Sequence, residues 1–82
     1  MVYGDIKLIK KDKEKSVISV DNTRLTILKG DNIKVLSDTN ANYSHGGNCE
    51  LFNVTYDEFI NSFDEYGMLT DDLSYVYGIS IE

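Results

Sequence analysis

Residues 54–67 read Val-Thr-Tyr-Asp-Glu-Phe-Ile-Asn-Ser-Phe-Asp-Glu-Tyr-Gly, and in this stretch the start, the face and the stop of a helix agree. Thr55 is a good N-cap because its hydroxyl can accept an N–H of the first turn, and Glu58 three residues later completes a capping box. Gly67 supplies the stop. One apolar stripe recurs at steps of three and four residues: Tyr56, Phe59, Ile60, Phe63 and Tyr66. The sequence therefore predicts one amphipathic helix over about residues 55–66.

Short apolar runs separated by turn residues predict β-strands on both sides of this helix. The two-residue connection Asp21-Asn22 tolerates the positive φ that a tight hairpin requires, and a second turn follows at residues 29–32. Three or four antiparallel strands in a meander therefore account for the first 37 residues, beginning with a strand at residues 2–9. Residues 49–54 and 74–81 predict later strands, and the turn-rich segment 37–48 predicts the longest loop.

These elements predict an α+β fold in a single domain over residues 1–82: a twisted antiparallel sheet of five or six strands with the helix packed on one face. A chain of 82 residues buries too little surface to be divided further. In the last strand, alternation places four apolar side chains on one face: Tyr75, Tyr77, Ile79 and Ile81.

The composition is that of a packed protein. Hydrophobic residues make up 41% of the chain, and six Tyr with three Phe argue against disorder. The lone Cys49 cannot form an intrachain disulfide, which favours a reducing compartment. No apolar run approaches the roughly 20 residues that cross a bilayer, and the N-terminus lacks the layout of a signal peptide. We therefore expect a cytoplasmic protein with no membrane contact.

Charge is distributed unevenly along the chain. All eight basic residues lie in the first 34 positions beside five acidic ones, whereas residues 35–82 carry nine carboxylates and no Lys or Arg. The charged run at residues 10–15 is best interpreted as a solvated hairpin tip rather than a phosphate-binding patch. A nucleic-acid site gains affinity from Lys and Arg, so direct binding of nucleic acid is not expected. A basic protein is the natural partner for the acidic half.

The sequence contains no constellation for catalysis or metal binding. His45 lies four residues before Cys49, but one His and one Cys are too few for a zinc site or for a nucleophile with its base and orienting group. At the start of a strand, Cys49 is expected to be a buried, inert thiol. We therefore expect no enzyme activity, no cofactor and no metal.

Three acidic pairs recur at seven-residue intervals: Asp57-Glu58, Asp64-Glu65 and Asp71-Asp72. On the predicted helix the first two pairs lie on the same side, about 10 Å apart along the axis. Two interpretations stay open, a solvated surface and a protein-binding face. Like charges on one helix face repel and add no stability, so the pairs are not explained by the stability of the helix, and the binding interpretation is kept beside the solvated one.

Tyrosines near these carboxylates favour the protein-binding interpretation. Tyrosine is enriched at interface hot spots because it buries apolar area and keeps a polar tip. Packing in the core is the competing explanation for Tyr75 and Tyr77, whereas Tyr43 and Tyr66 are the better candidates for the surface. The expected partner-binding residues are Asp57, Glu58, Asp64, Glu65, Asp71, Asp72, Tyr43 and Tyr66.

The function that this pattern predicts is stoichiometric inhibition of a basic protein, a nuclease or another nucleic-acid-binding protein, by carboxylates that occupy sites prepared for phosphates. In size, charge and tyrosine content the chain resembles the small acidic inhibitors that phages and mobile elements deploy against host nucleases, including anti-CRISPR proteins. Two alternatives remain at this stage. One is an immunity or antitoxin protein that neutralises a toxin, and the other is a structural module of a phage particle or larger assembly.

Overall fold

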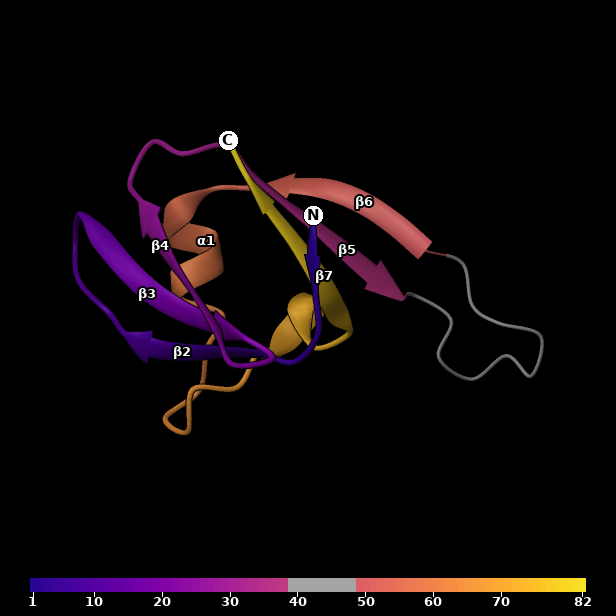
Figure 1. Ribbon diagram of the computed structural model, residues 1–82, viewed down its shortest axis with the longest axis horizontal. Coiled ribbons are helices and arrows are strands. Elements are labelled where there is room, and N and C mark those ends of the chain that lie inside the picture. Colours follow the sequence, from indigo (N-terminus) through magenta and orange to yellow (C-terminus); the bar gives the residue numbers. More distant parts are fainter. Residues whose placement is uncertain (39–48) are drawn as a thin grey trace.

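Residues 1–38 and 49–82 are described by the computed structural model, and they form seven strands, one α-helix and one short 3₁₀ helix (Figure 1). Their order is β1 (Val2–Tyr3), β2 (Ile6–Lys10), β3 (Lys15–Val20), β4 (Thr23–Leu28), β5 (Ile33–Asp38), β6 (Cys49–Val54), α1 (Tyr56–Ile60), η1 (Asp71–Leu73) and β7 (Val76–Ile81).

The strands form two antiparallel sheets, of order β1-β7-β5-β6 and β2-β3-β4. Antiparallel strands combined with a helix confirm the predicted α+β class. The prediction of one sheet of five or six strands is wrong in detail, because the strands divide into a sheet of four and a sheet of three.

The hairpin between β3 and β4 forms as predicted. Asp21 and Asn22 have φ angles of 47° and 71°, the left-handed conformations that a tight two-residue turn needs. The Asp21 carboxylate also accepts the N–H of Asp5 at 2.7 Å, so this turn holds the segment that leads from β1 into β2.

The predicted first strand is divided at Gly4, which has a φ of 140°. Val2 and Tyr3 pair with β7, whereas β2 pairs with β3, so the chain passes from one sheet to the other here. A side chain at Gly4 would collide with the Asp21 carboxylate, which explains why glycine stands at this crossing.

The predicted meander ends after β4. The turn at residues 29–32 carries the chain into the other sheet, where β5 pairs with β6 and β7 and not with β4. Asn32 and Glu82 exchange two backbone hydrogen bonds of 2.9 Å and align the start of β5 with the end of β7. Turn residues predict that the chain reverses, but they do not specify which strand pairs next.

A β-bulge at Tyr77 changes the predicted faces of the last strand. Leu36 pairs with Gly78 and Ser37 pairs with Val76, so Tyr77 is the extra residue in β7. Val76 and Ile79 are both buried as a result, and strict alternation from Tyr75 to Ile81 is lost.

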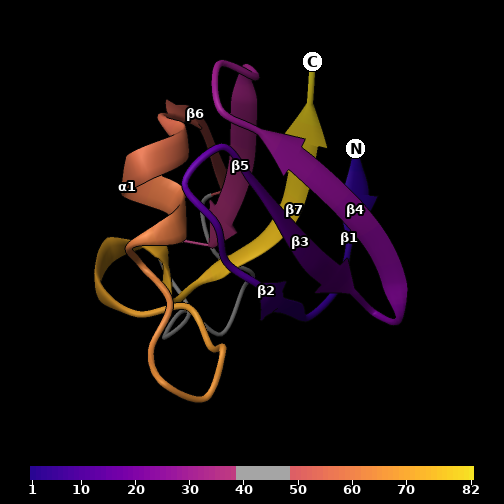
Figure 2. The same ribbon diagram turned by 90° about the vertical axis from the view of Figure 1, so that its left-hand side faces the viewer.

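The core lies between the inner faces of the two sheets and is closed by α1 and η1 (Figures 1 and 2). Each sheet supplies β-branched side chains, and α1 adds Tyr56, Phe59 and Ile60. Phe59 is fully buried and its ring meets that of Phe63 edge to face at 5.2 Å. Burial of these side chains supplies the main driving force for folding.

Helix α1 starts where the sequence predicts and ends earlier. The Thr55 hydroxyl accepts the N–H of Glu58 at 3.1 Å, which confirms the N-cap. The helix stops at Ile60 with Asn61 as C-cap, so the prediction of a helix over residues 55–66 is wrong in its second half. The Ser62 hydroxyl donates to the Glu58 carbonyl at 2.6 Å, and the Ser62 carbonyl accepts from the Thr70 hydroxyl. These two bonds turn the chain away from the helix axis.

Residues 63–69 form a separate structure, the 63–69 loop. Phe63 and Leu69 bridge its base, and the Asp64 carboxylate accepts the N–H groups of Tyr66 and Met68, both at 2.9 Å. Gly67 is not a helix stop. With a φ of 78°, it accepts the N–H of a β2 residue at 2.9 Å and so joins the loop to the edge of that strand.

Candidate functional site

Three of the predicted acidic residues come together around one hollow, the acidic pocket. It has a volume of about 500 Å³ and lies between β6, α1 and η1. Its lining consists of Phe52, Glu58, Asn61, Ser62, Asp71, Asp72 and Leu73. Carboxylates from two separate segments therefore meet at one place, although they are 13 and 14 residues apart in the chain.

Two hydrogen bonds to the Ser62 carbonyl position the two acidic segments of this pocket. The Ser62 carbonyl accepts both the N–H and the hydroxyl of Thr70, at 2.7 and 3.0 Å. Thr70 directly precedes η1, so these bonds fix the 3₁₀ helix against the end of α1. Asp71 has a φ of 57°, an uncommon conformation for a residue with a side chain.

The acidic pocket combines exposed carboxylates with an apolar floor. Glu58, Asp71 and Asp72 are exposed, Phe52 is half-buried, and Leu73 is buried. None of the described residues that line the pocket is basic. A Lys or Arg side chain that entered it would gain opposite charges for its head group and apolar contact for its stem.

The predicted helical surface of four carboxylates does not form. Asp57 and Glu58 are on α1 but line different hollows, and Asp64 and Glu65 are in the 63–69 loop. Asp64 is exposed, yet its carboxylate is engaged by two backbone N–H groups of its own loop. Its role in the structure is to hold that loop.

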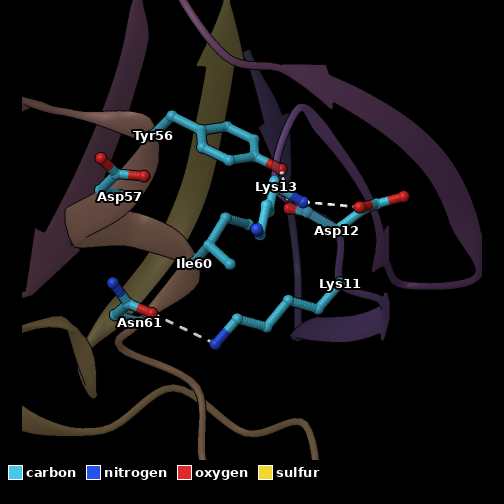
Figure 3. Close-up of a pocket in the computed structure, with 7 residues that line it drawn as sticks. All are labelled: Lys11, Asp12, Lys13, Tyr56, Asp57, Ile60 and Asn61. Carbon is cyan, nitrogen blue, oxygen red and sulfur yellow. Dashed lines mark hydrogen bonds between the residues drawn. The ribbon is translucent and has the colours of Figure 1, made fainter.

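Asp57 lines a second hollow of about 470 Å³ (Figure 3). Residues of the β2–β3 connection face α1 across it, and the Lys11 ammonium donates to the Asn61 side-chain oxygen at 3.2 Å. The lining has both signs of charge: Lys11, Asp12, Lys13, Tyr56, Asp57, Ile60 and Asn61. This mixture favours no ligand class, but Asn61 lines both hollows and so connects them.

A buried hydrogen-bond network fixes α1 to the β2–β3 connection. The Tyr56 hydroxyl donates to the Asp12 carbonyl at 2.7 Å and lies 2.8 Å from the Ser16 hydroxyl. Because the single phenolic proton is donated to Asp12, the Ser16 hydroxyl is the donor to Tyr56. Ser16 accepts in turn from the Asp12 N–H at 3.3 Å, so its 1% exposed hydroxyl is satisfied.

The predicted tyrosines have different environments. Tyr66 is 80% exposed at the tip of the 63–69 loop, and Tyr75 is 58% exposed. Tyr43 lies outside the described residues, as does His45. The structure therefore places Tyr66 on the surface and leaves the prediction for Tyr43 as it was.

Cys49 is exposed at the start of β6, so the expectation of a buried thiol is wrong. Its sulfur lies 3.0 Å from the Tyr77 hydroxyl, and the Tyr77 ring stacks on Tyr3 with centroids 6.3 Å apart. The hydrogen bond with Cys49 raises the pKa of Tyr77 above its usual value, and partial desolvation adds to the increase.

Sequence reasoning missed the uncharged residues of the acidic pocket, which are Phe52, Asn61, Ser62 and Leu73. For Phe52 a signal existed, because alternation along residues 49–54 puts it on the same face as Val54, next to the start of the helix. Asn61 and Ser62 carried no such signal, since they were expected within a continuous helix.

Within residues 1–38 and 49–82, no group of three or more His, Cys, Asp or Glu side chains is arranged to hold a metal ion. In the same residues, no helix has the length and apolar character to cross a membrane. Comparisons with protein-family models, with curated proteins and with solved structures found no match. Function is therefore inferred from the residues of this chain alone.

Proposed function

We propose that this protein is a stoichiometric, non-catalytic inhibitor that binds a basic surface of another protein. The target is a nuclease or other nucleic-acid-binding protein, and the mechanism is phosphate mimicry by carboxylates. The type is that of the acidic inhibitors of phages and mobile elements, such as anti-CRISPR proteins. The observation that carries the proposal is the acidic pocket, where Glu58, Asp71 and Asp72 surround an apolar floor.

The physical argument is the excess of negative charge at the acidic pocket: three carboxylates line it, whereas the neighbouring Lys11 lines the second hollow and binds the Asn61 side-chain oxygen. No Lys or Arg follows position 34, and within residues 1–38 and 49–82 no basic side chain lines the pocket. A surface of this kind attracts a partner with the opposite field and speeds its association. The floor made by Phe52 adds what a purely acidic surface lacks, an apolar contact for the stem of the incoming Arg or Lys.

The other predicted contact residues differ in whether a partner can reach them without a change in the fold. Asp57, Glu65 and Tyr66 are exposed and available to a partner. Asp64 is also exposed, but a substitution there would disturb the 63–69 loop through its two backbone hydrogen bonds. A loss of binding in an Asp64 variant would therefore not identify a direct contact.

A structural module of a larger assembly is the second candidate, and one observation favours it. On the outer face of the four-stranded sheet, the register aligns Tyr3, Gly78, Leu36 and Leu51 in one row across the four strands. Tyr3 is 58% and Leu51 55% exposed. An apolar row of this kind would associate in a way that salt does not weaken.

The test is capture of binding partners from host-cell lysate at low and at high salt, followed by mass spectrometry and by a nucleic-acid-binding assay of the captured protein. The proposal expects a basic nucleic-acid-binding protein whose capture is lost at high salt and whose nucleic acid competes with the inhibitor. Capture of only the protein itself, insensitive to salt, would favour the structural module and contradict the inhibitor.

A further inference from the structure

The three-stranded sheet carries four basic side chains on its outer face, which we call the basic face. Cross-strand register places its residues in three rows, because residues directly opposite each other point to the same side of a sheet. The rows are Lys7 with Ser19 and Arg24, Lys10 with Val17 and Thr26, and Lys15 with Leu28.

The orientation of these rows follows from burial. Ser16, Ile18 and Val20 of β3 are buried, so the intervening residues of β3 and their partners point outward. A bulge at Ile9 keeps Lys10 on the outer side together with Lys7. All four cations of the basic face are exposed.

No carboxylate interrupts the basic face. Strands β2, β3 and β4 contain three Lys and one Arg and neither Asp nor Glu. Asp5 and Asp21 lie at one end, where they share a hollow with Lys7 and Ser19. Arg24 shares the row of Lys7 and Ser19 at that end, and the row of Lys15 ends beside Asp31, whose carboxylate accepts the Leu28 N–H at 2.8 Å. The carboxylates therefore flank the basic face at its two ends, and none stands within its strands.

Helix α1 and its carboxylates lie on the opposite side of this sheet. Ser16 points inward from β3 and meets Tyr56 of α1 at 2.8 Å, whereas the cations point outward. Exposed charges separated by more than the Debye length, about 8 Å at physiological salt, are largely screened from each other. The acidic side is thus largely screened from a ligand on the basic face, although the whole chain has a net charge of −6.

We propose that the basic face binds the phosphate backbone of a nucleic-acid duplex without sequence preference. Rows two residues apart are separated by about 7 Å, and β2 and β4 by about 10 Å, so the cations form a grid that can contact about four phosphates. The outward positions of the three strands include no aromatic residue, and binding of single strands relies on aromatic stacking. The chemistry therefore favours the backbone of a duplex.

This inference goes beyond the proposed inhibitor function, since it concerns a different face and a different class of partner. It also departs from the expectation of no direct contact with nucleic acid, which rested on charge summed along the chain.

The experiment is a fluorescence-anisotropy titration of a labelled mixed-sequence DNA duplex, with single-stranded DNA and anionic phospholipid vesicles as competing probes. The test variant is Lys10→Gln with Arg24→Gln. The matched control is Lys13→Gln with Lys34→Gln, which changes the charge equally but lies in the hollow beside α1 and on the outer face of the other sheet. Circular dichroism checks that both variants fold.

Four phosphate contacts give a slope of about −3.6 in log affinity against log salt, so the wild type should lose about 150-fold in affinity between 50 and 200 mM salt. The test variant should retain about half the slope and lose about 12-fold over the same range. The control should behave as the wild type. The proposal is overturned by no duplex binding at 50 mM salt, by equal loss in both variants, or by preference for single strands or vesicles over the duplex.

Discussion

Replacing Tyr56 by Phe removes one oxygen atom from a buried network and leaves the ring in place. The hydroxyl donates to the Asp12 carbonyl at 2.7 Å and accepts from Ser16 at 2.8 Å, and Ser16 is only 1% exposed. Its loss leaves the Ser16 hydroxyl proton without a partner, which costs about 1–3 kcal/mol. In a domain of this size each kcal/mol lowers the unfolding midpoint by about 4–8 °C.

Urea denaturation followed by circular dichroism measures this loss, and an unchanged slope m would show that the unfolded state is unaffected. Tyr75→Phe is the matched control, because Tyr75 is 58% exposed; it should change stability by less than about 0.5 kcal/mol. Ser16→Ala combined with Tyr56→Phe should cost less than the sum of the single variants, since neither partner is then left unsatisfied. If Tyr56→Phe and Tyr75→Phe unfold at the same urea concentration, the network does not fix α1 as described.

Three further predictions concern the 63–69 loop and the Tyr77 pair. Asp64→Asn should weaken the acceptor of two loop N–H groups, cost about 1 kcal/mol, and speed hydrogen exchange of those amides; unchanged exchange would contradict the assigned role. Gly67→Ala should lower the melting temperature more than Gly30→Ala, because its Cβ would lie 2.8 Å from the Leu8 carbonyl oxygen whereas Gly30 has open space; equal shifts would refute this. The pKa of Tyr77 is raised above 10.0, so the stabilising effect of its neutral form is complete below pH 10 and is lost as pH rises through the folded-state value. Cys49→Ala should lower that pKa in an absorbance titration of the phenolate, and an unchanged curve would exclude the hydrogen bond as the cause.

The sequence predicted a structural feature correctly where two to four neighbouring residues determine it. The Thr55 cap depends on one hydroxyl and one N–H within the first helical turn, and both are where the sequence predicts. The hairpin at Asp21-Asn22 depends on two residues that tolerate positive φ, and both adopt it. Neither feature needs a partner from elsewhere in the chain.

The end of the helix was not readable because distant residues determine it. The apolar stripe continues to Tyr66, but Thr70 binds the Ser62 carbonyl and Asp64 closes its own loop. These bonds give backbone groups partners outside a helix, and the 63–69 loop joins the edge of β2.

The sequence predicted the acidic residues of the candidate site, but it did not predict which of them lie together in the folded chain. A seven-residue repeat pairs Glu58 with Asp64-Glu65 on an ideal helix, whereas the folded chain pairs Glu58 with Asp71 and Asp72. The same limit applies to charge. Summed along the sequence it predicts one acidic half, but strand register separates a basic face from an acidic pocket within one small protein.

The most direct test of the acidic pocket is a calorimetric titration of the captured partner with Glu58→Gln plus Asp72→Gln, compared with Glu14→Gln plus Glu82→Gln. Both double variants remove two exposed negative charges, but only the first removes them from the pocket. Loss of two pocket ion pairs should weaken binding by about 10- to 100-fold, whereas removal of charges elsewhere should change it only a few-fold. Equal affinities of the two double variants would contradict the central claim that the acidic pocket is where the partner binds.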